Sequence, residues 1–417
     1  MRLLFLTPQL PLPPHTGITK GTTLRNFGLL AGLAARHQVH LLSFSSPGDG
    51  PDPARALQDV CTSVEPVPEP DRGIRDRIWA LLTSRSPDLA HRLTSPDFAR
   101  ALQDLLAAQS FDVIQFEGLE TAPYLAQVLE HADRTGVRPR LVLDEHNAEY
   151  VLQRRVFEMD VQRPRRWPSA LYSLAQWHKL KRFEAWACRH VDAVVAVSET
   201  DARALRQIAP GARVSVVPNG LDVQSYADFA SAEALPPQSL IFTGTMDYRP
   251  NVDAVLWFAQ HVYPLVQRRV PGVRFYVVGR RPHSRLDPLR RQPGIEITGG
   301  VPDTRPFIRA ASAYVIPLLS GGGTRFKVLE AMAMRCPIVS TSMGCDGFPV
   351  VSGRDVLLAD EPEAFAEQVV GLLSDERLRR ELGKAGLEFA RRYDWSEIVP
   401  MLDEVYWRIA KGERLSE

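Results

Sequence analysis

The chain has 417 residues, more than one ordinary hydrophobic core accommodates, so its length favours two domains. Its 50 Lys and Arg residues balance 49 Asp and Glu residues, and the formal net charge of +1 gives no global argument for a nucleic-acid partner. A hydrophobic content of 45% is that of a folded globular protein, which excludes a largely disordered chain.

The four cysteines argue against a metal site. They form no CxxC pair, and no histidine accompanies Cys61, Cys188, Cys336 or Cys345 at zinc spacing. Scattered unpaired cysteines fit a reducing cytosol. The N-terminal MRLLFL lacks the length and cleavage site of a signal peptide, and no stretch approaches the ~20 continuous apolar residues of a membrane span. We therefore expect a cytoplasmic protein without a metal.

The first half of the chain alternates short apolar runs with helical patterns. Residues 2–44 follow a strand–loop–helix–strand order, which is a βαβ opening. Later apolar runs, bounded by turn residues, predict buried parallel strands at 113–116, 141–144, 194–197 and 214–217, and helical patterns lie between them at 96–108, 121–131 and 169–190. Residues 1–224 are therefore predicted to be a doubly wound, Rossmann-like α/β domain.

The same alternation restarts in the second half. Residues 225–238 lack periodicity and end in Pro-Pro, which indicates an interdomain linker. Residues 239–395 are predicted to be a second Rossmann-like domain, with strands at 240–243, 274–278, 295–298, 313–316 and 338–341 and helices at 251–269, 303–310, 325–334, 362–373 and 375–391. The final segment, 396–417, carries an amphipathic helix that we expect to pack back on the first domain.

Ligands of doubly wound sheets bind outside the carboxyl ends of the strands, so we expect the two domains to face each other across a site-bearing cleft. After the first strand, Gly17 could let the backbone approach a phosphate, with Lys20 as a cation. The alternative is an ordinary turn. His146 follows a later strand in DEHNAEY, and it could bind a sugar hydroxyl or orient a phosphate. Strand alternation predicts that Asp144 and Glu145 do not both point into the cleft; the alternative is a solvated strand end.

The second half offers two further glycine turns. Gly244 directly follows a strand, and Asn251 is expected to cap the next helix. The stretch SGGGTRFKVLE, residues 320–330, places a glycine-rich turn at a helix N-terminus beside two cations and a carboxylate. A diphosphate linked to a ribose suits this combination, and a glycine loop before a core helix is the alternative.

Residues 151–190 carry nine Lys or Arg residues against three Asp or Glu residues, with interleaved aromatic residues. This segment could touch an anionic membrane or a lipid-linked acceptor, and the alternative, favoured for most of the aromatic side chains, is helix packing in the core. No nucleic-acid-binding module is present, so we expect no nucleic-acid partner.

Four features, taken in their order along the chain, resemble those of GT-B glycosyltransferases. They are the His after the first-domain strand, VPNGLD, TGTMDYRPN and GGGTRFKVLEAMAMRCPIVST. The sequence is most similar to the retaining group called family 4, and within it to a bacterial subgroup of exopolysaccharide and cell-envelope glycan assembly. The resemblance spans nearly the whole chain. It implies metal-independent transfer of a sugar from a nucleotide-sugar donor to a glycan or lipid-linked acceptor, with retention of configuration.

The resemblance also implies roles for individual residues. Arg325 and Lys327 would contact the diphosphate and, with His146 at the donor sugar, form the catalytic set. Glu330 would hold the ribose hydroxyls. The remaining donor-binding candidates are Gly17, Lys20, Gly244, Asn251, Gly322, Gly323 and Thr324.

The sequence departs from the family pattern at two positions. Gly322 occupies the position of the family's first glutamate, so backbone N–H groups of 322–324 would have to serve the donor sugar. Ile18 replaces the second of two paired glycines. Two other functions stay open: a nucleotide-sugar epimerase of the same architecture, and a non-catalytic protein that binds a nucleotide sugar or glycan. A peripheral location at the inner face of the cytoplasmic membrane stays open as well.

Overall fold

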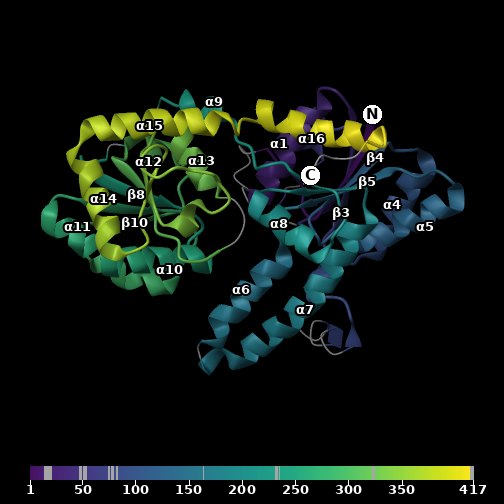
Figure 1. The fold of residues 1–417 in the computed structure, drawn as a ribbon, viewed down its shortest axis with the longest axis horizontal. Coiled ribbons are helices and arrows are strands. Elements are labelled where there is room, and N and C mark those ends of the chain that lie inside the picture. Colours follow the sequence, from purple (N-terminus) through teal and green to yellow (C-terminus); the bar gives the residue numbers. More distant parts are fainter. Residues whose placement is uncertain are drawn as a thin grey trace. The chain divides into compact units, whose positions relative to one another are not determined.

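The structure is a computed structural model that describes residues 1–13, 21–46, 49, 54–73, 76, 79–80, 83–162, 164–230, 233, 235–321 and 325–413. It divides into two compact units (Figure 1). The first unit is Met1–Pro218 together with Ile398–Glu417, and the second is Asn219–Glu397. Each unit is built around one parallel sheet. This architecture confirms the predicted α/β class with two Rossmann-like units.

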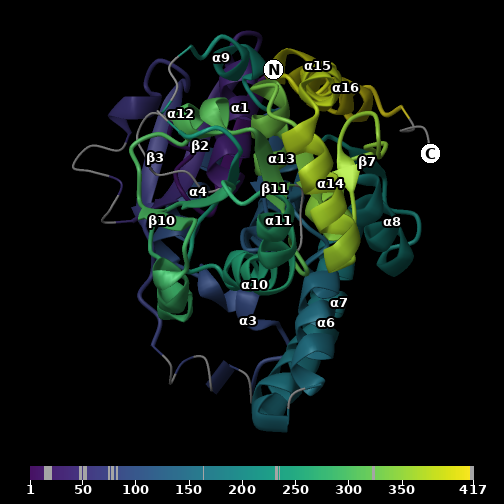
Figure 2. The same ribbon diagram turned by 90° about the vertical axis from the view of Figure 1, so that its left-hand side faces the viewer.

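In the described part of the first unit, the sheet has the strand order β3-β2-β1-β4-β5-β6-β7. The strands are β1 Arg2–Thr7, β2 Gln38–Ser45, β3 Ser63–Pro68, β4 Val113–Glu117, β5 Arg140–Glu145, β6 Ala193–Ala196 and β7 Val214–Val216. The helices are α1 Gly21–Ala34, α3 Asp88–Arg92, α4 Pro96–Ala108, α5 Leu125–Thr135, α6 Glu149–Val161, α7 Trp167–His190 and α8 Glu199–Ile208. Helices α6 and α7 pair as a long hairpin that extends from the body of this unit (Figures 1 and 2).

The second unit's sheet has the order β10-β9-β8-β11-β12-β13 over the described residues. The strands are β8 Ser239–Thr243, β9 Arg274–Val278, β10 Ile295–Gly299, β11 Ala313–Ile316, β12 Ile338–Ser340 and β13 Leu357–Leu358. The helices are α9 Val223–Ala227, α10 Arg249–Trp257, α11 Tyr263–Arg269, α12 Arg305–Ala310, α13 Phe326–Ala333, α14 Pro362–Ser374, α15 Glu376–Arg391 and α16 Trp395–Ala410. Helix α16 begins in the second unit and ends in the first.

The central strands are buried on both faces because helices flank each parallel sheet. All four residues of β6 are buried, which explains why this strand is a continuous apolar run rather than an alternating one. All five residues of β4 are buried as well, and its two polar residues, Gln115 and Glu117, are hydrogen-bonded to each other. The side chain of Ser198 accepts a hydrogen bond from the Asp201 backbone N–H (3.1 Å) and so caps the N-terminus of α8.

Several elements differ from the sequence prediction, among them β3, α6 and the helix predicted at 251–269. Strand β3 was not predicted because Pro66 and Pro68 disguise it, and prolines are tolerated there because β3 lies at the sheet edge. Helix α6 precedes the single helix predicted at 169–190. The helix predicted at 251–269 changes to a π-helical turn at Phe258–Val262 just before Pro264, whose ring nitrogen cannot donate an intrahelical bond.

The unit boundary falls at Pro218 and Asn219, before the segment 225–238 that was predicted as a linker. Part of that segment is helix α9, which packs on α13 of the second unit. At the other end of the chain, the Tyr406 hydroxyl on α16 donates to Gln115 Oε1 of β4, within the first unit. Among the described helices, none is both long and apolar enough to cross a membrane.

Candidate active site

The strand orders define where each unit can bind a ligand. The order reverses between β1 and β4 in the first sheet and between β8 and β11 in the second. Loops on the two sides of such a reversal run in opposite directions, which opens a crevice at the carboxyl ends of the strands. The residues around these two positions form two separate polar clusters, and we describe each within its own unit.

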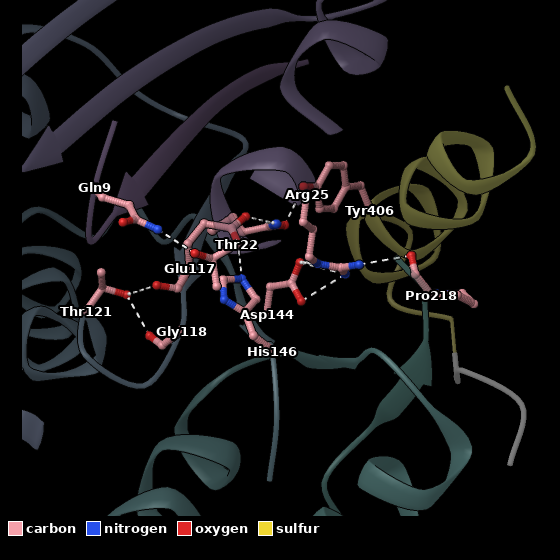
Figure 3. A network of polar contacts seen from close by, with 11 residues as sticks. Gln9, Thr22, Arg25, Glu117, Gly118, Thr121, Asp144, His146, Pro218 and Tyr406 are labelled. Carbon is pink, nitrogen blue, oxygen red and sulfur yellow. Dashed lines mark hydrogen bonds and ion pairs between the residues drawn. The ribbon is translucent and has the colours of Figure 1, made fainter. Parts of the chain in front are cut away.

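The first-unit cluster is organised by a buried ion pair (Figure 3). Arg25 of α1 and Asp144 of β5 are 1% and 0% exposed, and the guanidinium Nε and Nη2 donate to both Asp144 oxygens at 2.9–3.1 Å. Nη1 of Arg25 also donates to the Pro218 carbonyl (2.9 Å). Burying such a pair is tolerated only when its geometry is good and its remaining polar atoms are bonded, as they are here. The pair therefore fixes α1 against the end of β5.

His146 lies beside this pair and is oriented by Glu117 at the end of β4. Its Nε2 is 3.0 Å from Glu117 Oε2. The other carboxylate oxygen of Glu117 accepts from the Gln115 amide (2.6 Å). In the amide orientation that gives both the oxygen and the nitrogen of Asn26 suitable hydrogen-bond partners, the nitrogen donates to Glu117 Oε2 (3.0 Å). Figure 3 shows the imidazole between Glu117 and Asp144. His146 is thus held in one orientation by a buried carboxylate.

Electrostatics favour a charged His146. Burial lowers the pKa of His146, but the hydrogen bond that the imidazole donates to Glu117 and the charges of Asp144 and Glu117 outweigh it, and the net shift is upward. Ligand atoms of Glu117, Asp144 and His146 lie within 4.8 Å of one another, a spacing that a metal ion could use. A metal does not suit this set, because both Asp144 oxygens are bonded to Arg25 and the guanidinium would repel a second cation.

Asp144 and Glu145 point in different directions, as strand alternation predicts. Asp144 faces the cluster with Arg25. Glu145 is 1% exposed, and neither of its carboxylate oxygens has a hydrogen-bond partner among the described residues. Burial, followed by the charges of Glu184 and Glu149, raises the pKa of Glu145 well above its ordinary value. Asp144, and not Glu145, therefore belongs to the candidate site.

The second-unit cluster is built on Lys327 of α13. Its Nζ donates to the Thr243 carbonyl at the end of β8 (3.0 Å) and to Asn251 Oδ1 (3.1 Å), and it lies 4.1 Å from the centre of the Phe242 ring. Burial, together with the charge of Arg325, lowers the pKa of Lys327 to about 7. The ammonium group is therefore held at a carboxyl strand end and lacks a carboxylate in direct contact among the described residues.

Gly244 leaves the space in which this lysine sits. A Cβ there would meet Asn251 Nδ2 at 2.7 Å and Lys327 Nζ at 3.3 Å, and its φ of +154° is unfavourable for side chains. Asn251 does not cap α10 as predicted. The helix begins earlier, at Arg249, and the Asn251 side chain is engaged instead by Lys327 and by the Thr245 carbonyl, to which it donates (3.0 Å).

Arg325 precedes α13 and lies against Gly321, which follows β11. A Cβ on Gly321 would approach Arg325 Nη2 to 2.8 Å, so a glycine is needed for the guanidinium to take this position. Gly321 also has a φ of +132°, in the region that favours glycine. Gly244 and Gly321 thus stand on the two sides of the β8–β11 reversal, where a bound diphosphate would be expected.

Glu330 lies five residues into α13 and is held by a tyrosine from α9. The Tyr226 hydroxyl donates to Glu330 Oε1 (3.1 Å). Burial raises the pKa of Glu330, while the hydrogen bond from Tyr226 and the charge of Lys327 oppose that rise. Arg305 lies over the rings of Tyr226 and Phe229, with its carbon Cζ at 5.7 Å and 4.5 Å from their centres. Cations and aromatic rings thus surround the carboxylate.

The structure tests the placement of some predicted residues and not of others. Lys327, Asn251 and Gly244 meet in one cluster. Arg325 lies directly before α13, the helix that carries Lys327, and Glu330 lies within that helix. Gly17 and Lys20, as well as Gly322, Gly323 and Thr324, lie outside the described residues. The sequence prediction missed Arg25, Glu117, Tyr226 and Arg305. Glu117 had a usable signal, a carboxylate at the end of an apolar strand, whereas Arg25 resembles an ordinary surface cation in a helix.

The comparisons with known proteins agree with this architecture. A family model described as Glycosyltransferase Family 4 matches residues 21–225, and one described as Glycosyl transferases group 1 matches residues 237–375. The chain therefore belongs to the group 1 and family 4 glycosyltransferases. A phosphatidyl-myo-inositol mannosyltransferase of Mycobacterium tuberculosis is 31% identical over 234 residues, which are 52% of this chain and 59% of that protein. The match thus spans little more than half of each chain.

Solved structures share the complete fold. A sucrose-phosphate synthase from Thermosynechococcus elongatus aligns with a TM-score of 0.72 at 17% identity, over 99% of this chain and 100% of that one. The Anabaena protein HepE, in complex with UDP, aligns with a TM-score of 0.64 at 14% identity, over 97% and 99% of the two chains. The fold is therefore GT-B.

Proposed function

We propose that the chain transfers a sugar from a nucleoside-diphosphate sugar to a glycan or lipid-linked acceptor, with retention of configuration and without a metal. The observation that carries this proposal is Lys327, a buried ammonium bonded to a strand-end carbonyl and an amide beside Gly244. A buried cation with a lowered pKa is costly unless an anion binds it. A diphosphate supplies that anion.

The comparisons support the reaction class. The mycobacterial relative is named as a mannosyltransferase, and HepE was solved with UDP. Glu330 and Tyr226 supply hydrogen-bonding groups for ribose hydroxyls one helical turn from Lys327. The phosphatidyl-myo-inositol in the name of the mycobacterial protein also supports a lipid-linked acceptor and a role in envelope or exopolysaccharide synthesis.

The proposed chemistry is stabilisation of the leaving group. When the bond between the sugar and the diphosphate breaks, negative charge develops on the diphosphate. Lys327 and Arg325 would stabilise that charge with donors fixed before the reaction, which replaces the charge that a divalent ion supplies in other enzymes. Gly17 and Lys20 are proposed to approach the donor from the loop after β1, and the backbone of Gly322, Gly323 and Thr324 from the loop after β11.

We assign His146 to contact with the transferred sugar. Glu117 bonds Nε2, so Nδ1 is the ring nitrogen turned away from Glu117 and the one assigned to substrate. The upward shift of the His146 pKa favours the protonated imidazole, in which both ring nitrogens are hydrogen-bond donors. This assignment makes His146 a hydrogen-bond donor rather than a general base.

Contact with the inner face of the cytoplasmic membrane belongs to the same proposal. At the tip of the α6–α7 hairpin, Trp167 and Leu171 are 58% and 68% exposed, next to the exposed Arg165. Exposed apolar side chains beside a cation suit an anionic lipid interface. Sedimentation with phosphatidylglycerol vesicles, but not with phosphatidylcholine vesicles, is expected, and Trp167→Ser should reduce it.

Acceptor-dependent release of nucleoside diphosphate tests the reaction. The purified chain would be incubated with UDP-glucose or GDP-mannose and a pooled glycan-lipid acceptor. Release that requires the acceptor supports a transferase. A nucleotide-sugar epimerase would convert the donor without any acceptor, and a binding protein would bind it without turnover. Absence of release with every donor and acceptor, in a chain that binds UDP, would overturn the transferase proposal.

A further inference from the structure

The second unit contains a cavity at the edge of its sheet opposite the cluster around Lys327. The cavity has a volume of about 640 Å³, which lies within the range of small-molecule sites. Ser312 and Pro337 line it, and they directly precede the parallel strands β11 and β12. The cavity therefore lies at the amino ends of these strands, whereas Lys327 is held at the carboxyl end of β8. A ligand in this cavity would leave the proposed donor site open.

Helix α15 forms one wall of the cavity and packs closely on the end of α13. A Cβ on Gly383 would lie 2.5 Å from the Arg335 carbonyl oxygen, and one on Gly386 would lie 3.3 Å from Met332 Cγ. Glycines at these two positions of α15 therefore let the two helices approach each other. This packing brings Arg335, which follows α13, and the side chains of α15 to one cavity.

The lining of the cavity carries an excess of positive charge. Two carboxylates, of Glu376 and Glu388, line it together with five cations, which are Arg335, Arg379, Arg380, Lys384 and Arg391. Each carboxylate is already paired with one arginine of α15. Among the described residues, neither Arg335 nor Lys384 has an ion-pair partner. Like charges that share a cavity repel one another, and a bound anion would remove that repulsion.

Arg335 adopts a backbone conformation that favours glycine. It follows Met334, the C-cap residue of α13, and its φ is +56°. Glycine is the usual residue at this position because a side chain in the left-handed region costs free energy. The Arg335 side chain is exposed, so its burial does not offset this cost. An anion in contact with the guanidinium would offset it, and strain of this kind is typical of functional positions.

The kind of cation in the lining suits phosphate. Four of the five cations are arginines, and a guanidinium presents a planar set of N–H donors that matches two phosphate oxygens. Lys384 and Arg391 are seven residues apart on α15, which is about 10 Å along the helix axis. The positive charge thus extends along the cavity, and a ligand with more than one phosphate group would contact more of it.

We infer that this cavity binds the phosphate groups of a ligand other than the sugar donor. None of its lining residues belongs to the cluster around Lys327, so the inference does not depend on the proposed function. It adds a second anion site to the chain and predicts that both sites can be filled at the same time.

Titration calorimetry with inorganic pyrophosphate tests the inference. The full chain would be titrated in about 150 mM NaCl, which screens long-range attraction, and with saturating UDP, which keeps pyrophosphate out of the donor site. Arg335→Gly removes the guanidinium at a position that favours glycine, and Lys384→Gln removes the second unpaired cation. Arg377→Gln is the matched control, because Arg377 also lies on α15, is 87% exposed and does not line the cavity.

We expect pyrophosphate to bind the UDP-saturated wild type with a Kd of about 0.1 mM. Arg335→Gly should weaken this binding about tenfold and Lys384→Gln about fivefold, whereas Arg377→Gln should leave it unchanged. The midpoint of thermal unfolding should not fall in Arg335→Gly, so weaker binding by this variant cannot come from a loss of fold. Absence of pyrophosphate binding beside UDP, or an equal loss in Arg377→Gln, would overturn the inference.

Vesicles that contain phosphatidic acid distinguish the two sources of such a phosphate. Vesicle sedimentation weakened by Arg335→Gly would place the phosphate on a lipid headgroup. Sedimentation that Arg335→Gly leaves unchanged, with pyrophosphate binding that it weakens, would place the phosphate on a soluble molecule.

UDP binding separates this inference from the proposed function. Pyrophosphate binding that depends on Arg335, in a chain that does not bind UDP, would support the cavity and count against the transferase proposal. UDP binding without a further site for pyrophosphate would overturn the cavity assignment and leave the transferase proposal standing.

Discussion

Replacing Lys327 by methionine should strengthen the fold and weaken donor binding at the same time. Burial lowers the pKa of this lysine from 10.5 to about 7, which corresponds to about 5 kcal/mol of unfavourable charge burial. Methionine has a similar length and would lie over the Phe242 ring, but it leaves the Thr243 carbonyl and Asn251 Oδ1 without the ammonium donor. Each lost bond costs about 1–3 kcal/mol.

Taken at the middle of these ranges, the net effect is a protein about 1 kcal/mol more stable near neutral pH. For a unit of this size the midpoint of thermal unfolding should rise by a few degrees. The folded state binds fewer protons than the unfolded state between pH ~7 and ~10.5, so wild-type stability rises with pH and the difference between the two proteins shrinks. UDP affinity should fall about 30-fold, since charged hydrogen bonds to the diphosphate contribute about 2 kcal/mol.

Differential scanning calorimetry at several pH values and titration calorimetry with UDP measure both effects. Lys181→Met, at an exposed lysine of α7, is the matched control, and it should change neither quantity. A Lys327→Met protein that is less stable than wild type by more than about 1 kcal/mol, and that binds UDP within twofold of wild type, would refute the reasoning.

The other predictions concern ligand binding, turnover and stability. UDP affinity of the wild type should decrease as pH rises above about 7, because the protonated Lys327 binds the diphosphate, and binding should take up protons; an affinity independent of pH between 7 and 9 would contradict this. Glu330→Ala should weaken UDP about tenfold but leave pyrophosphate binding unchanged, and equal losses for both ligands would place Glu330 away from the ribose. His146→Ala should lower kcat at least about tenfold with UDP affinity retained, and an unchanged kcat removes His146 from the sugar site. Asp144→Ala should destabilise the first unit by about 3–5 kcal/mol in urea unfolding, because Arg25 stays buried without its carboxylate; a loss below about 1 kcal/mol would mean that the pair is dispensable.

The fold followed from local patterns to a large extent. An apolar run such as AVVA indicates a buried parallel strand, because helices cover both faces of that strand in the sheet. The edge strand β3 escaped prediction because its prolines carry a turn signal, and only the pairing of Pro66 with Ser43 in the sheet shows it to be a strand. Likewise, α9 lay in the segment predicted as a linker, since five residues are too few for a helical period.

The candidate site was predictable where its parts are close in sequence. The glycine-rich turn, Arg325, Lys327 and Glu330 all lie within residues 320–330. Their spacing in the sequence was therefore enough to predict that they belong to one site. The assignment of Asn251 as a helix cap was wrong because a local rule was applied to a residue that a distant lysine engages. No spacing rule indicates that the Tyr226 hydroxyl meets Glu330.

The sequence by itself determined the two-domain α/β architecture, the family and the chemical character of the cluster around Lys327 in the second unit. These depend on hydrophobic periodicity and on contiguous motifs, which act over short stretches of chain. Only the tertiary structure decided that Arg25 neutralises Asp144, that Glu117 orients His146, and that the Thr243 carbonyl and Asn251 hold Lys327. Each of these depends on burial and on contacts between elements far apart in the chain, and burial is what turns an ordinary charge or amide into a group that requires a partner.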